Sequence, residues 1–425
     1  MPQLNIKDAK TANVIIMHYV TAALLFLIIC VLLLISHTVL IGHYFHPKLL
    51  AITHIATLGW ISMVIIGSLY QLTPVITNTP LFSTKMAIYA YLLILTGSLL
   101  LAIAFWVFDV TYLIQVASIL LLTGISLFLS NIYLTVQQSK EKNIEADFIS
   151  TSVFWFWLTA FLGTLLAFNF RYTFLPKEHL YFLKIHAHLG LLGWFLCLII
   201  GVASKLVPMF LISGKLNHKL LQYSYYLLNL GLLGFTIDSL FLNGVNRSII
   251  YVVPIIIALI LFILYIKEAY DKRLKKNLDI GMKHTFISFI LILIPVILWL
   301  MIKTNAIGDA NFNLQLSIAL GFSILFGFIS LLILGQTFKN LSFIVWLKKY
   351  QYHSRKQNTP LPKDLYSENL AKIQLYLFLA AFFTLLEGIL SSTEITLKIG
   401  AICLLSAAIL YNINVFKIVS HKRMV

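Results

Sequence analysis

Runs of about 20 apolar residues recur from one end of this 425-residue chain to the other, and each can cross the roughly 30 Å hydrocarbon layer of a membrane as a helix. Only 11% of the residues are charged and 60% are hydrophobic, whereas soluble proteins carry about a quarter charged residues, so a soluble enzyme is excluded. The sequence therefore predicts an all-α polytopic membrane protein with a single integral membrane domain over 1–425. The twelve expected transmembrane helices cover 13–36, 49–73, 85–107, 110–136, 150–170, 180–211, 219–241, 247–269, 283–302, 312–337, 370–389 and 394–416.

Positive charge is distributed unequally between the two sides of such a bundle. The net charge is +16, and of the 31 Lys and Arg residues 22 fall on the side of the two termini, six on the opposite side and three within spans. Because Lys and Arg concentrate in cytoplasmic loops, this bias predicts a multi-pass protein of a bacterial-type inner (cytoplasmic) membrane with both termini cytoplasmic. The expected partner is the lipid bilayer, and no nucleic-acid partner is expected. The longest connection, 338–369, is predicted to be a basic cytoplasmic loop whose first half lies as an amphipathic helix on the bilayer surface.

An internal repeat indicates how the twelve helices are arranged. The second and sixth spans superpose without a gap at an offset of 134 residues, which pairs His54 with His188, Leu58-Gly59-Trp60 with Leu192-Gly193-Trp194, Gly67 with Gly201, and Pro74 with Pro208. A third copy of this pattern is expected in the tenth span at Leu320-Gly321-Phe322, with Leu316 in the place of the histidine. The repeat predicts three pseudo-symmetric four-helix units, over about 13–136, 150–269 and 283–416, with the second helix of each unit turned toward a common interior. It argues against a transporter built from two six-helix halves.

Three histidines are expected at one depth in the membrane. With cytoplasmic termini, His54, His186 and His188 all lie one to two helical turns below the outer surface. Ionisable groups in hydrocarbon normally face the bundle interior with a partner, and neutral imidazole binds iron, copper or zinc. We therefore expect these residues to ligate a cofactor or metal. His186 and His188 face opposite ways on their helix, so they serve two separate sites, or one is a ligand and the other is structural.

The segment His186-Ala187-His188 followed by Leu192-Gly193-Trp194, Gly201 and Pro208 resembles the His-x-His helix of the haem–copper oxidase subunit I superfamily, in the style of its cbb-type oxidases and nitric-oxide reductases. That family has twelve helices in three four-helix arcs. The resemblance implies that His186 ligates a high-spin haem and that His188 and His54 together ligate a low-spin haem, with haem b as the cofactor. The chain is also similar to NnrS-like membrane proteins, which are associated with haem, copper and nitric-oxide stress.

Two departures from the family pattern bear on the activity. The His-x-His motif lies on the sixth span and not on the tenth. The seventh span, which would carry the adjacent His-His pair of a copper site, contains no histidine. Copper binding is therefore possible only with a ligand set that differs from the family's, and the resemblance implies a divergent member of the superfamily.

Several further residues are candidates for supporting roles. His43 and His46, which precede the second span, are a secondary candidate pair for copper or for a haem propionate. Arg171 and Arg247 on the outer side either pair with propionates or anchor the helices at the interface. The acids Asp238 and Glu387 lie within spans and either belong to a proton path or hydrogen-bond a histidine.

The function expected from these observations is membrane haem binding with a redox, nitric-oxide or stress-related role, served by an electron-donor cytochrome or a partner subunit. The sequence identifies no catalytic residue. One alternative is a catalytic terminal oxidase or nitric-oxide reductase subunit, which would make the protein an oxidoreductase. The other is a haem or metal transporter in which the histidines form a transient site.

Overall fold

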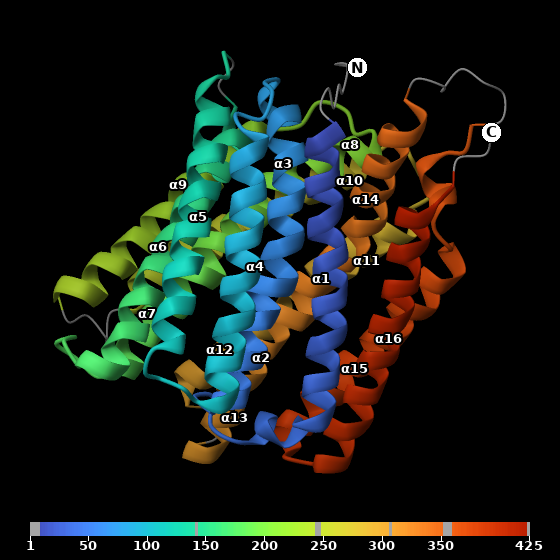
Figure 1. Ribbon diagram of the computed structural model, residues 1–425. Helices are drawn as coiled ribbons and strands as arrows, with labels where there is room; N and C mark the ends of the chain where they lie inside the picture. Colours follow the sequence, from blue (N-terminus) through green and yellow to red (C-terminus); the bar gives the residue numbers. More distant parts are fainter. Residues whose placement is uncertain (1–8, 141–142, 243–247, 306–307, 352–358, 423–425) are drawn as a thin grey trace.

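The computed structural model describes residues 9–140, 143–242, 248–305, 308–351 and 359–422. Over these ranges the regular elements are helices, and no β-strand is present beyond one isolated bridge between Ser213 and Arg273. Twelve helices are long and apolar enough to cross a membrane (Figure 1). The prediction of an all-α polytopic membrane protein is therefore confirmed.

Seven spans are single helices: α1 (Ala9–Ile35), α4 (Thr84–Val107), α5 (Leu113–Gln137), α6 (Ile144–Tyr172), α10 (Ser248–Asp271), α15 (Glu368–Ser391) and α16 (Glu394–Ser420). The other five spans join two or three segments each. They are α2 (Pro47–His54), η2 (Ile55–Ser62) and α3 (Met63–Thr77); α7 (His179–His188), η3 (Leu189–Leu196) and α8 (Cys197–Leu211); α9 (His218–Ile237) and η4 (Asp238–Leu242); α11 (Ile280–Leu291) and α12 (Leu293–Thr304); and α13 (Ala310–Phe322), η6 (Ser323–Ser330) and α14 (Leu331–Tyr350).

The second, sixth and tenth spans each contain a π-helical segment of eight residues, and these segments, η2, η3 and η6, begin 134 residues apart. The third copy of the repeat therefore lies six residues later than the sequence comparison indicated. Its centre is Phe326-Gly327-Phe328, and Phe322 takes the position of His54 and His188. The prediction based on Leu320-Gly321-Phe322 is wrong in register because the π segments, and not the most similar letters, mark the equivalent positions.

A glycine recurs at the same interval in α3, α8 and α14 and receives a side chain from a neighbouring helix. A Cβ atom added to Gly67 or Gly335 would lie 2.7 Å or 2.4 Å from the Cβ of a histidine, His18 or His284 respectively. At Gly201 it would lie 2.3 Å from the Cβ of Phe148. Because small residues let membrane helices approach closely, these contacts fix α1, α6 and α11 against the three inner helices.

The remaining helices join the three units into a ring. α5 packs against α6, and α1 packs against α16, so the first and last spans are neighbours (Figure 1). Between the second and third units, Phe262 of α10 contacts Phe289 of α11, with ring centroids 5.6 Å apart. The arrangement supports three four-helix units around the inner spans.

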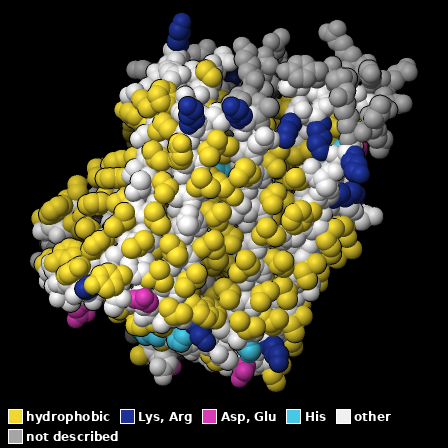
Figure 2. All heavy atoms as spheres, viewed as in Figure 1, with side chains coloured by type: hydrophobic (Ala, Val, Ile, Leu, Met, Phe, Trp, Pro, Cys, Tyr) yellow, Lys and Arg dark blue, Asp and Glu magenta, His cyan; other side chains and the backbone are white. Residues whose placement is uncertain are grey.

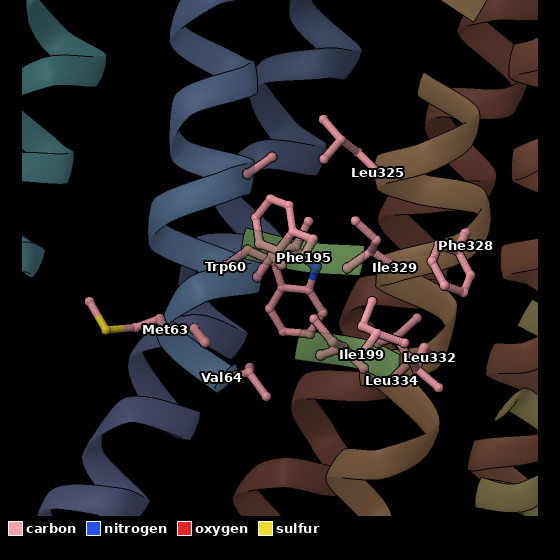
Figure 3. Packing of buried hydrophobic residues seen from close by; sticks show 14 of the residues in the cluster. Trp60, Met63, Val64, Phe195, Ile199, Leu325, Phe328, Ile329, Leu332 and Leu334 are labelled. Atoms are coloured by element: carbon pink, nitrogen blue, oxygen red, sulfur yellow. The ribbon is translucent and has the colours of Figure 1, made fainter. Parts of the chain in front are cut away.

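The three inner spans meet at the centre of the bundle. The Trp60 indole N–H donates to the hydroxyl of Ser330 (3.1 Å), and the Trp194 indole N–H donates to the hydroxyl of Ser62 (2.9 Å). Figure 3 shows Trp60, Phe195 and Ile329 meeting between the second and tenth spans. Two satisfied indole–hydroxyl pairs thus join the three inner spans.

The sequence predicts that the first half of the 338–369 connection is a surface helix, and this prediction is wrong. α14 continues through the bundle to Tyr350, and Leu341, Ile344 and Val345 are almost completely buried. The end of α14 lies against α1 and α16, where Lys348 donates to the side-chain oxygen of Asn13 (2.6 Å) and Lys349 donates to the carbonyl of Val419 (3.3 Å). Residues 352–358 lie outside the described ranges, and a short 3-10 helix, η7 (Pro362–Leu365), follows.

The two ends of the bundle differ in their polar side chains. α1 begins and α16 ends at the same end, where Figure 2 shows most of the Lys and Arg side chains on the visible face, while histidines gather at the opposite end. We call these the terminal end and the histidine end.

At the terminal end, Asp279 caps α11 and joins it to α14. Its carboxylate accepts hydrogen bonds from Lys339 (2.5 Å) and Lys275 (2.8 Å), and from the backbone N–H of Met282 (3.1 Å). Burial alone would raise the pKa of Asp279, but these three donors outweigh it and lower the pKa to about 2.

We predict that the glycine contacts are essential for stability at Gly201 but not at Gly321, which faces open space. Gly201→Ala is expected to destabilise the protein by about 1–3 kcal/mol, because Phe148 must move. Gly321→Ala, the matched control, is expected to be neutral or stabilising by up to about 1 kcal/mol. Thermal unfolding of the detergent-solubilised variants, followed by tryptophan fluorescence, measures both. Equal midpoints would contradict the packing described for α8.

We also predict an acid-labile component of stability at Asp279. Because its folded pKa is lowered, its contribution is present above about pH 4 and is lost as the pH falls toward 2. With allowance for solvent screening it amounts to about 1–2 kcal/mol. Asp279→Asn is expected to be less stable at neutral pH and to lose less stability on acidification, as measured by unfolding midpoints over this range. A variant with an unchanged pH profile would refute the role of this carboxylate.

Candidate functional site

His54 lies at the junction where α2 becomes the π segment η2. Its Nδ1–H donates to the backbone carbonyl of Leu50 (2.8 Å), one turn earlier in the helix. Its ring stacks on Phe105 of α4, with centroids 4.8 Å apart, and its centroid lies 6.3 Å from that of His186 of α7. The backbone and Phe105 thus orient the imidazole toward the sixth span.

His186 is oriented by the fifth span and not by its own helix. Its Nδ1–H donates to the backbone carbonyl of Thr159 in α6 (3.0 Å). A Cβ atom added to Gly163 would lie 2.9 Å from the Cε1 of His186. The missing side chain at Gly163 therefore provides the space in which the imidazole lies against α6.

The two imidazole rings are near-parallel, with an interplanar angle of 23° and a centroid distance of 6.3 Å. An imidazole nitrogen lies about 2 Å from a metal that it binds, and its ring centre lies about 1 Å further away, so two rings on opposite sides of one metal have centres about 6 Å apart. The centroid distance between His54 and His186 matches this value. Histidine is also a common axial ligand of haem iron.

The structure pairs His54 with His186 and not with His188. The Nδ1–H of His188 donates to the carbonyl of Lys184 in its own helix (2.7 Å), and its ring contacts Phe235 of α9 with centroids 5.0 Å apart. Residues two apart on a helix point about 200° from one another. Because His186 faces α6 and α2, His188 faces the seventh span.

All three histidines use Nδ1 for a carbonyl hydrogen bond, and a carbonyl can only accept, so Nδ1 carries the proton. Within the described part of the chain, none of the three Nε2 atoms has a hydrogen-bond partner. A hydrogen bond from one ring nitrogen leaves the other to act as a metal ligand. The pair His54 and His186 thus presents two Nε2 ligands.

The candidate charged residues are not gathered at this pair. The Arg171 guanidinium donates to the hydroxyl of Tyr112 (3.0 Å) at the exposed end of α6, and Arg247 lies outside the described residues. Glu387 is exposed on α15. Asp238 is buried, and neither of its carboxylate oxygens has a partner among the described residues. It lies one turn from Phe235 and hence on the side of His188.

An outward-facing pocket of about 560 Å³ lies at the histidine end. It contains His43 and His179, together with Lys177 and the rings of Phe45 and Phe170. His43 accepts a hydrogen bond from the backbone N–H of Phe45 (3.0 Å). His46 caps α2 and is not part of the pocket lining, although its buried Nδ1 has no partner among the described atoms. Of the predicted pair, His43 therefore lines this pocket and His46 does not.

Sequence reasoning missed the residues that hold the pair in place, namely Thr159, Gly163 and Phe105. Thr159 acts through its backbone carbonyl, which no side-chain pattern reveals. Gly163 in the middle of an apolar helix was a visible signal, since glycine in such a helix marks a close approach. No group of three or more His, Cys, Asp or Glu residues that could hold a metal ion is found among the residues that the structure describes.

Comparison with known proteins adds no further assignment. No model of a protein family matches the chain, and no curated protein matches it. The fold and the site define the class only, an all-α polytopic membrane protein with a histidine pair at one end of the bundle.

We predict that His54 and His186 are neutral Nδ1–H tautomers, because each Nδ1 donates to a carbonyl. Nitrogen-15 NMR of histidine-labelled protein measures the tautomer through the two ring-nitrogen shifts. Gly163→Val is expected to shift the His186 resonances and to leave those of His188 unchanged, since only His186 contacts Gly163. An Nε2–H tautomer at either residue would contradict the site geometry.

Proposed function

We propose that this chain is a membrane haem-binding protein in which His54 and His186 ligate the iron of one haem b between the second and sixth spans. One observation carries the proposal. Two near-parallel imidazoles from different helices lie with centroids 6.3 Å apart, and neither Nε2 atom has a hydrogen-bond partner among the described residues. The predicted ligand pair His54 and His188 is replaced in this proposal by His54 and His186.

The residues around the pair have distinct roles in holding such a cofactor. The carbonyls of Leu50 and Thr159 fix the ring orientations and increase the basicity of the free nitrogens. Phe105 covers the His54 ring and helps to exclude water. A haem supplies one-electron redox chemistry, and its potential depends on the axial ligands and on burial.

Ligation by two histidines would favour electron transfer over binding of a small substrate, because both protein ligands would stay on the iron. The proposed role is therefore electron transfer, with an external electron-donor cytochrome or partner subunit. His188 and Asp238, on the opposite side of α7, are not needed for this iron. Copper has no part in this proposal, since the histidine pair already provides the two ligands that the iron requires.

The proposal also includes an orientation in a bacterial-type inner membrane, with the terminal end in the cytoplasm. The excess of Lys and Arg at that end supports it. Green fluorescent protein fused to the C-terminus, which becomes fluorescent in the cytoplasm but not after export in the unfolded state, tests it. Fluorescent cells are expected. Non-fluorescent cells that still make the full-length fusion would reverse the orientation.

We predict a low-spin b-type absorption spectrum for the purified protein. His54→Ala and His186→Ala are each expected to lose the low-spin bands, because one axial ligand is removed. His188→Ala is expected to keep them, as is His218→Ala at the terminal end. Reduced-minus-oxidised spectra and the haem-to-protein ratio measure the effect. A wild-type spectrum in both His54→Ala and His186→Ala, or a protein without haem, would refute the proposal, and dependence on His188 would restore the pairing predicted from sequence.

A further inference from the structure

Four lysines gather at one corner of the terminal end, where α14 and α16 end beside the start of α1. Lys348 and Lys349 lie in the last turn of α14, and Lys417 lies in the last turn of α16. Lys422 follows α16 and is exposed. Figure 2 shows basic side chains gathered at this corner on the visible face. We call these four residues the lysine corner.

Contacts between helices hold the lysine corner together. The Lys349 ammonium group donates to the backbone carbonyls of Val419 (3.3 Å) and His421, which lie at the end of α16. Lys348 donates to the side-chain oxygen of Asn13 in α1 (2.6 Å). The corner is therefore built from three helices, and the hydrogen bonds that hold it are accepted by neutral oxygen atoms.

The positive charge of the lysine corner is not neutralised within the described part of the chain. Three lysines elsewhere at the terminal end form ion pairs with Glu268 or Asp279. None of the four corner lysines forms an ion pair among the residues that the structure describes. Burial lowers the pKa of His421, and the nearby charges of Lys349 and Lys417 lower it further. An anion bound here would relieve this repulsion.

The lysine corner lies at the depth of lipid headgroups. α16 is 27 residues long, which corresponds to about 40 Å and exceeds the roughly 30 Å hydrocarbon layer. Its last turn, with Lys417, therefore reaches the headgroup region. Ile409, Ile413 and Phe416 are exposed on the preceding turns of the same helix face, where acyl chains can pack against them. A ligand with an anionic head and apolar chains matches both features.

We propose that the lysine corner binds the phosphate headgroup of an anionic phospholipid. Clusters of lysines at the ends of membrane spans attract anionic lipids, and each lysine near the surface adds to the attraction. Lys349 is already engaged at the end of α16, so Lys348, Lys417 and Lys422 provide the ammonium groups for the headgroup. This inference requires only that the chain lies in a bilayer. It is independent of the proposed haem site, which lies toward the opposite end of the bundle.

Native mass spectrometry of the full-length protein, with phosphatidylglycerol or phosphatidylcholine added in detergent, tests the proposal. The wild type is expected to bind phosphatidylglycerol at least about tenfold more tightly than phosphatidylcholine. The double variant Lys348→Gln, Lys417→Gln is expected to bind phosphatidylglycerol about tenfold more weakly than the wild type, because two cationic contacts are lost. Lys348→Arg, Lys417→Arg keeps both charges and is expected to retain the wild-type affinity.

Lys215→Gln, Lys219→Gln is the matched control, because it removes two exposed lysines between α8 and the first turn of α9, at the same end of the bundle. Its affinity for phosphatidylglycerol is expected to change by less than about twofold. Equal losses in the two glutamine variants would overturn a local site and leave only a general attraction to the basic end. Equal affinities of the wild type for both lipids would overturn the proposal as well.

A measurement on the wild-type protein decides the question if the glutamine variant does not fold. Histidine NMR in nanodiscs is expected to show a higher pKa for His421 with phosphatidylglycerol than with phosphatidylcholine, because the bound headgroup offsets the repulsion from Lys349 and Lys417. His218, which is exposed at the same end, reports the general effect of a charged bilayer surface. A shift at His421 no larger than that at His218 would contradict the site.

Discussion

The close approach of the second, sixth and tenth spans at the centre of the bundle is the constraint on which the other helices depend. In hydrocarbon an unpaired polar group is costly, so the two indole N–H groups at this crossing need acceptors from other spans. The Trp60 indole donates to Ser330, and the Trp194 indole donates to Ser62. At the third equivalent position, Phe328 replaces the tryptophan and Leu196 replaces the serine, so these two side chains cannot form a third indole–hydroxyl hydrogen bond. The two hydrogen bonds join the first unit to the third and the second unit to the first.

The same spans carry the histidine pair, and their π segments explain how. η2 begins directly after His54, and η3 begins directly after His188. π-helical segments often occur at functional sites. On the side of these segments toward the terminal end, the glycine contacts hold the inner helices tightly. On the other side, an imidazole from α2 and one from α7 lie with ring centroids 6.3 Å apart. Packing in the centre therefore positions the histidine pair near the end of the bundle.

Much of the fold could be predicted from the sequence, because span length and hydrophobicity are local properties. The repeat of 134 residues was visible in the second and sixth spans, where Leu-Gly-Trp is retained. It was placed in the wrong register in the tenth span, because there the Leu-Gly-Trp pattern is lost and only Gly327, Ile333 and Gly335 keep the residue types of both other spans. The extension of α14 was missed because its basic residues were interpreted as a surface signal, although Lys339 is paired with Asp279 inside the protein.

The site was predicted in part. The depth of His54, His186 and His188 follows from their positions along the spans, but their partners depend on helix rotation, which the sequence alone did not determine. Two residues turn His186 toward His54. Gly163 leaves room for the imidazole because it has no side chain, and Thr159 accepts a hydrogen bond through its backbone carbonyl. The pocket at the histidine end, with His43 and His179, likewise combines two segments that are far apart in the chain.

The most direct test of the central claim is an experimental map of the purified protein with anomalous diffraction recorded at the iron absorption edge. The account predicts one iron peak between the Nε2 atoms of His54 and His186. An iron peak bound to His188 instead, or a protein that contains no iron when haem is supplied, would contradict it.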